Sequence, residues 1–187
     1  MRLPRYSRRA ASILLVSTIT SYWGFSGKSN LTPESDRTDA DKVDSYMNDA
    51  EMQQFNNQGE LLRSLVARRI EHRTATADNY FDHPQLSLNR QPEQPPVVIS
   101  ARQGISSDND QLIELRRDVV IDPQSEPPSQ LSTEQLYIQP EVNFAWTGEL
   151  VAYYRGTNTT QAVGMNAYFD QERVELLTDV RGHYEAN

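Results

Sequence analysis

Histidine and carboxylate side chains are the groups of this sequence that could carry acid–base or metal chemistry. His72, His83 and His183 are scattered along the chain without the short spacings that bring metal ligands together. Glu114 and Glu175 lie on the polar sides of alternating segments, where we expect solvated carboxylates rather than a catalytic pair. The chain has no cysteine, which excludes a thiolate nucleophile and a cysteine metal site. We therefore expect no enzymatic activity, no metal and no cofactor.

Nucleotide and nucleic-acid chemistry are also disfavoured. The segment Gly24-Phe25-Ser26-Gly27-Lys28-Ser29 ends like a phosphate-binding loop, but the first glycine of that motif would fall on Tyr22. The formal net charge is -8. A nucleic-acid partner requires an excess of lysine and arginine to neutralise phosphates, so we exclude that class.

The remaining candidates for function are apolar side chains, which occur in segments where apolar and polar residues alternate. Alternation of apolar and polar residues predicts half-buried strands, and prolines and polar clusters between the segments predict turns. Short strands with turns at this spacing indicate an all-β sandwich or open barrel. The predicted strands include Val97–Ser100, Gln111–Asp122, Leu131–Pro140, Glu149–Tyr154 and Arg173–Tyr184.

Three further features refine this prediction. Residues 61–72 fit either a helix or a strand, and the turn before them, with Asn57 and Gly59, favours a strand. The alternation in 111–122 slips near Asp118, which predicts a β-bulge. The sequence around Ile113 to Val119 is echoed by Val174 to Val180, which suggests a repeated strand unit.

The pattern of the N-terminal region predicts that the chain is attached to a membrane. Residues 1–9 are basic, and 10–27 are uncharged and long enough to cross a hydrocarbon core as one helix. The basic start predicts that the N-terminus faces the cytoplasm. A cleaved signal peptide is the alternative. Residues 28–49 are acidic and poor in apolar side chains, so we expect a flexible linker before a domain covering 50–187.

With this organisation the chain resembles the LptC family, the bitopic subunit of the lipopolysaccharide export machinery. The basic start, single span and polar tether carry the first part of the likeness. Ordered motifs carry the rest: Phe55-Asn56-Asn57-Gln58-Gly59-Glu60-Leu61-Leu62, Tyr80-Phe81-Asp82-His83-Pro84, Leu131-Ser132-Thr133 with Leu136-Tyr137-Ile138, and Leu176-Leu177-Thr178-Asp179-Val180-Arg181-Gly182-His183-Tyr184.

The resemblance implies an open, V-shaped antiparallel β-jellyroll that follows one transmembrane helix. Such a domain binds the acyl chains of lipid A in an apolar groove and passes lipopolysaccharide on. The alternative for each apolar residue is ordinary core packing. The candidate groove residues are Phe81, Val98, Ile113, Leu115, Ile138, Val174, Leu176 and Tyr184.

The resemblance also implies partners and a place in the cell. The N-terminal edge would meet the LptF/LptG transporter, with LptB as its ATPase, and the C-terminal edge would meet the periplasmic bridge protein LptA. The chain would be a single-pass protein of the inner membrane, with most of its length in the periplasm. Candidate edge and turn residues are Gly59, Gly156, Gly164 and Asp179. The glycines suit positive φ in turns, and Asp179 is acidic where the family often has a basic residue.

Two other functions fit parts of the sequence. A membrane-tethered scaffold without lipid cargo would share the anchor and the exposed strand edges. A secreted hydrolase would need a cleaved N-terminal segment and two carboxylates that converge in a pocket.

Overall fold

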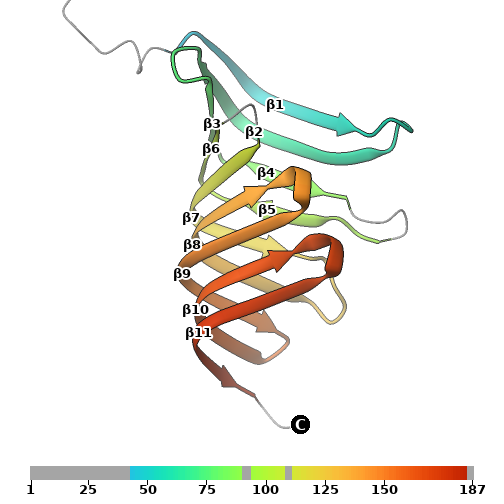
Figure 1. Cartoon of the computed structure of the whole chain (residues 1–187), viewed down its shortest axis with the longest axis vertical. Helices are drawn as coiled ribbons and strands as arrows, with labels where there is room; N and C mark the ends of the chain where they lie inside the picture. Colours follow the sequence, from blue (N-terminus) through green and yellow to red (C-terminus); the bar gives the residue numbers. More distant parts are fainter. Residues whose placement is uncertain (1–42, 90–93, 108–110, 185–187) are drawn as a thin grey trace, which may run out of the picture. The chain divides into compact units, whose positions relative to one another are not determined.

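The computed structural model describes residues 43–89, 94–107 and 111–184, and most of them form β-strands (Figure 1). The all-β prediction is therefore confirmed, including a strand rather than a helix over residues 61–72. The strands are β1 (Ser45–Phe55), β2 (Leu61–Arg73), β3 (Asp78–Asp82), β4 (Gln85–Leu88), β5 (Val97–Ser100), β6 (Gln103–Ser107), β7 (Leu112–Asp122), β8 (Ser129–Gln139), β9 (Phe144–Arg155), β10 (Asn158–Tyr168) and β11 (Arg173–His183). Two 3-10 turns, η2 (Pro140–Val142) and η3 (Phe169–Gln171), join β8 to β9 and β10 to β11.

The predicted membrane span and most of the predicted linker lie outside the described residues. Within the part of the chain that is described, no helix has the length and apolar character needed to cross a membrane. One boundary of the sequence prediction was wrong: β1 begins at Ser45, inside the segment 28–49 assigned to the linker. The reason is that Met47, Ala50 and Met52 pair with the apolar Ile70, Ala67 and Leu65 of β2, which acidic composition alone did not reveal.

All strands form one antiparallel sheet that folds back on itself. The strand order is β11-β10-β9-β8-β7-β5-β4-β2-β3-β6, with β1 on β2 and a further pairing of β6 with β7. One half of β2 pairs with β3 and the other half with β4, while β7 pairs with both β5 and β6. The sheet therefore has two layers, which meet along one side and diverge on the other (Figure 1). This arrangement is consistent with an open jellyroll.

Residues with left-handed backbone conformation mark the bend between the layers. They include Asp49, His83, Asp118, Gly164 and Asp179, with φ between 48° and 78°. The β7–β8 register shifts between Arg116 and Val119, which confirms the predicted bulge near Asp118. Aspartate and glycine tolerate positive φ better than most residues, so these residue types suit the bend.

The hydrophobic core lies between the layers. Alternate residues of the central strands face inward and are at most 1% exposed: Leu115, Val119, Leu136, Ile138, Ala145 and Met165. Burial of a side chain of this size stabilises the fold by about 1.5–3 kcal/mol relative to exposure. The two layers are therefore held together by side chains that come from every long central strand.

We predict that Ile138→Ala lowers the free energy of unfolding by about 2–5 kcal/mol, because it removes fully buried methyl groups and leaves a cavity. Urea unfolding of the purified protein, followed by circular dichroism, measures this change. Val142→Ala is the matched control, since Val142 is 63% exposed and its truncation is expected to change stability little. Equal stability of the two variants would show that Ile138 does not pack as described.

Candidate functional site

A cavity of about 880 Å³ lies between the two layers on the side where they diverge. One wall comes from the ends of β5, β7, β8 and β9, and the other from β10, η3 and β11. Its apolar lining includes Val97, Ile121, Leu131, Tyr153, Ala167, Phe169, Val174 and Leu176, together with Pro95, Pro123 and Tyr168. Cavities of this size with mainly apolar walls bind ligands by removing their apolar surface from water.

Polar and charged side chains also line this cavity. They are Gln94, Gln124, Ser125, Glu126, Ser129, Arg155, Glu172 and Arg173. The guanidinium of Arg173 lies 4.1 Å from the centroid of the Tyr168 ring and forms an ion pair with Glu175. A lining that combines apolar and polar groups suits an amphiphile.

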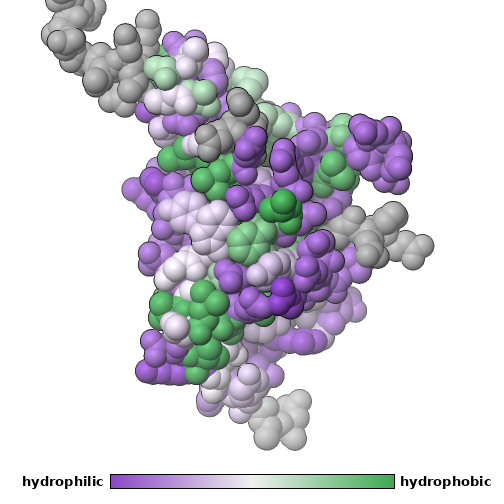
Figure 2. Space-filling view, viewed as in Figure 1, coloured by the Kyte–Doolittle hydropathy of each residue, from purple (hydrophilic) through white to green (hydrophobic). Residues whose placement is uncertain are grey.

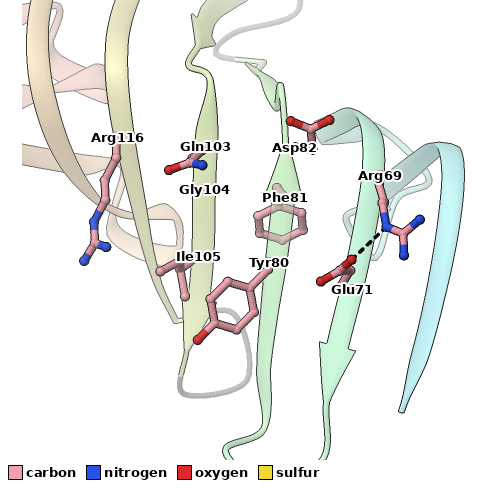
Figure 3. Close-up of a pocket in the computed structure, with 9 residues that line it drawn as sticks. All are labelled: Arg69, Glu71, Tyr80, Phe81, Asp82, Gln103, Gly104, Ile105 and Arg116. Carbon is pink, nitrogen blue, oxygen red and sulfur yellow. Dashed lines mark hydrogen bonds and ion pairs between the residues drawn. The ribbon is translucent and has the colours of Figure 1, made fainter. Parts of the chain in front are cut away.

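A second depression lies on the outer face of β2, β3, β6 and β7 (Figure 3). It holds charged groups that already have partners, because Arg69 Nε lies 2.7 Å from Glu71 Oε1 and Arg116 Nε lies 2.7 Å from Glu114 Oε1. Burial alone would raise the pKa of Glu114, but hydrogen bonds from Arg116 and Gln135 outweigh it and lower that pKa below its usual value. We assign these ion pairs to the solvated outer surface rather than to a reaction.

Six of the eight predicted groove residues face the interior. Val174 and Leu176 line the cavity itself. The other four, Phe81, Ile113, Leu115 and Ile138, belong to the packed core and are at most 7% exposed. The structure therefore divides the predicted groove into a filled part near the bend and an open part near η3 and β11.

The other two predicted groove residues lie elsewhere. Val98 points to the outer face, because the neighbouring Val97 and Ile99 are the buried residues of β5. Tyr184 follows the end of β11 and is 70% exposed, with its hydroxyl 3.4 Å from Thr160 Oγ1. Neither belongs to the apolar lining of the cavity.

Several lining residues were missed in the sequence analysis. Ile121 and Leu131 sit at inward positions of alternating strands, so the period of β7 and β8 could have identified them. Phe169 sits in the 3-10 turn η3, where no strand period applies. Its role as a lining residue becomes visible only when the two layers are assembled.

The three predicted glycines have the expected positive φ. Gly59 and Gly156 lie in the β1–β2 and β9–β10 turns with φ of +82° and +61°. Gly164 also has positive φ, but it lies in a bulge of β10 rather than in a turn, and a Cβ there would stand 3.0 Å from Leu177 Cδ1. Asp179 is exposed at the bend of β11, with φ of 51°.

Both edges of the sheet leave inward-facing apolar residues uncovered. In β7, Ile113 and Val119 are 7% and 0% exposed, whereas Val174 and Val180 at the equivalent positions of β11 are 45% and 53% exposed. At the other edge, Met47 and Met52 of β1 are 52% and 38% exposed. The inward-facing side of the sheet thus continues to each edge strand, where no further strand buries it. Hydrophobic residues also reach the surface over β10 and β11 (Figure 2).

The histidines do not converge on this cavity. Nδ1 of His72 lies 2.9 Å from Oδ1 of Asn79, and Nδ1 of His83 lies 2.8 Å from Oδ1 of Asp82. His183 is exposed at the end of β11. In the described ranges, no group of three histidine, aspartate or glutamate side chains is placed to hold a metal ion.

The chain is similar to a solved structure and matches a protein family. The crystal structure of LptH from Pseudomonas aeruginosa, the LptA homologous periplasmic component of a lipopolysaccharide transport device, is similar with a TM-score of 0.42 and 5% identity over 76% of this chain and 94% of that one. No match was found among curated proteins. The family model for LptC-related lipopolysaccharide assembly matches residues 11–185. The chain therefore belongs to the LptC-related family of lipopolysaccharide-assembly proteins.

Proposed function

We propose that this protein is a membrane-anchored subunit of the lipopolysaccharide export machinery that binds lipid A acyl chains between its two layers and passes them on. The observation that carries the proposal is the cavity of about 880 Å³, whose apolar walls continue toward an uncovered sheet edge. A scaffold without cargo would not need this space, because filling it with side chains would stabilise the fold.

The energetics suit acyl chains as cargo. Each methylene group moved out of water gains about 0.8 kcal/mol, so several acyl chains together would be strongly retained by a closed cavity. The cavity described here is open on one side, and its walls hold both aliphatic residues such as Leu131 and Leu176 and the ring of Tyr153. Partial enclosure keeps the lipid bound while leaving a route for its release.

Strand edges provide the proposed contacts with partners. An edge strand has unpaired backbone N–H and C=O groups that can pair with a strand of another protein. In our proposal β1 contacts the periplasmic domains of LptF and LptG, whose motion is driven by the ATPase LptB, and β11 contacts LptA. Each junction would bury the apolar residues that the edges now expose, such as Met47 and Val180.

Residues 10–27 supply the proposed anchor in the inner membrane, with residues 1–9 in the cytoplasm and the β-domain in the periplasm. The uncharged segment has the length of one span, and the arginines before it favour the cytoplasmic side.

We predict that a photoreactive amino acid at Leu131 or Leu176 crosslinks to lipopolysaccharide in cells that make it, because both positions line the cavity. Val98 is the matched control, as an aliphatic residue on the outer face from which we expect no adduct. Immunoblotting of the purified adducts for lipopolysaccharide provides the measurement. A folded, membrane-bound protein without adducts at either lining position would favour the scaffold without cargo.

We predict that Val180→Asp weakens binding of the purified protein to LptA about tenfold, because a carboxylate would be buried at the new junction. Surface plasmon resonance in the absence of lipid measures this affinity. The control is Val142→Asp, which adds the same charge at a position that is 63% exposed and belongs to η2 rather than to β11. If both variants bind LptA like the unchanged protein, β11 is not the contacting edge.

We predict that the intact chain, with Arg2 to Ser26 retained, is recovered from the membrane fraction after alkaline washing. Mass spectrometry of the extracted protein identifies the N-terminal peptide. Recovery of a soluble chain that begins after residue 27 would instead demonstrate a cleaved signal peptide.

A further inference from the structure

A smaller cavity of about 440 Å³ adjoins the apolar cavity, and its chemistry differs. Four amide side chains line it: Gln54 from β1, Asn89 after β4, Gln94 before β5 and Asn143 after η2. Arg63, Glu141 and Asp170 add charge, while Leu62, Leu88 and Pro140 supply the apolar part. This lining offers many hydrogen-bond donors and acceptors, which an acyl chain could not use.

Phe169 separates the two cavities. Phe169 and Gln94 are the residues that line both of them. Phe169 is only 6% exposed, although Asp170 and Gln171, which follow it in η3, are exposed. The ring therefore stands between an apolar compartment and one lined with amides.

The backbone around Phe169 fixes this boundary. The Phe169 N–H donates a hydrogen bond of 2.9 Å to the carbonyl oxygen of Asn143, which ties η3 to the end of η2. Both turns end in a residue with left-handed conformation, Asn143 and Glu172. The two turns lie one above the other on the side where the layers diverge (Figure 1). The amide of Asn143 and the ring of Phe169 are thus held at one site.

The amides are available to a ligand to different degrees. Asn89 already donates from Nδ2 to the carbonyl oxygen of Leu61 at 2.8 Å. Gln54, Gln94 and Asn143 are exposed side chains at the cavity wall. A primary amide has two N–H donors and a carbonyl acceptor, and so matches hydroxyl groups, which both donate and accept. An aromatic ring beside them adds a surface for the C–H groups of a sugar ring.

We propose that this smaller cavity is a second half-site, which binds the hydroxyl-rich sugar headgroup of the amphiphile whose acyl chains occupy the larger cavity. The inference rests on the proposed function and adds to it where the polar part of the ligand lies. Phe169 forms the boundary between the two half-sites, and Gln94 faces both.

The test is to ask which part of the lipopolysaccharide becomes attached at each cavity. A photoreactive amino acid is placed at Gln54 or at Leu176 in the full chain, in cells that make lipopolysaccharide. Mild alkali then removes the ester-linked acyl chains from the adducts, and tandem mass spectrometry of what remains shows whether the protein is joined to the sugar or to an acyl chain. We expect the bond to the sugar at position 54 and to an acyl chain at position 176. Gln161, an exposed amide outside the cavity lining, is the control expected to give no adduct.

Each other outcome is decisive. A fatty acid at position 54, or no adduct there when position 176 gives one, overturns the second half-site and leaves the proposed function standing. Absence of adducts at both positions in a folded, membrane-bound chain overturns both.

A variant of Gln54, which lines the smaller cavity and not the larger one, gives an independent readout. Gln54→Leu should lower the affinity of the full chain in nanodiscs for purified lipopolysaccharide about fivefold, because a hydrogen bond is lost. Its affinity for a saturated fatty acid, which has no sugar, should stay unchanged. Gln161→Leu should change neither affinity. Equal loss of affinity for both probes, or no loss for either, would contradict the half-site.

Discussion

The structure depends on one constraint: a single antiparallel sheet with one apolar face can bury that face only by folding onto itself. Every long central strand crosses the bend, and residues such as Asp118 and Gly164 supply the left-handed backbone that the crossing needs. Near the bend the layers are close, and side chains such as Leu115 and Ile138 fill the space between them. Farther from the bend, the inward-facing side chains of the two layers no longer touch one another, and a cavity remains between the layers.

This geometry makes core and binding site parts of one surface. The residues of β7 and β11 show it directly, because equivalent positions hold Ile113 in the packed core and Val174 beside the cavity. The difference is that β7 has neighbouring strands on both sides, whereas β11 lies at the edge of the sheet and has β10 on one side. Ordinarily, exposed apolar residues on an unpaired edge invite aggregation. In a chain whose neighbours supply the next strand, the same exposure becomes a means of joining proteins end to end.

The local pattern of the sequence was sufficient to predict the long strands over residues 111–122, 131–140 and 173–184, the bulge near Asp118 and the positive φ of Gly59 and Gly156. It did not predict the short strands β3, β4 and β6. It failed at Val98, because three consecutive apolar residues in β5 carry no alternation that shows which one points inward. It also could not show which inward residues border empty space, since that depends on how far apart the layers stand. The sequence did not identify Phe169 as a lining residue for the same reason, because its role depends on its position between two cavities.

The pairing of an apolar cavity with an amide-lined one bears on what kind of lipid the domain can distinguish. An apolar cavity alone would accept any chain of methylene groups, because the hydrophobic effect is not directional. Hydrogen-bonding groups held beside it, such as Gln54 and Asn143, reject a ligand that cannot use them, since they would lose contact with water without compensation. In our proposal, retention therefore comes from the acyl chains and selectivity from the headgroup. Because both cavities open on the side where the layers diverge, a bound amphiphile can leave without unfolding the sheet.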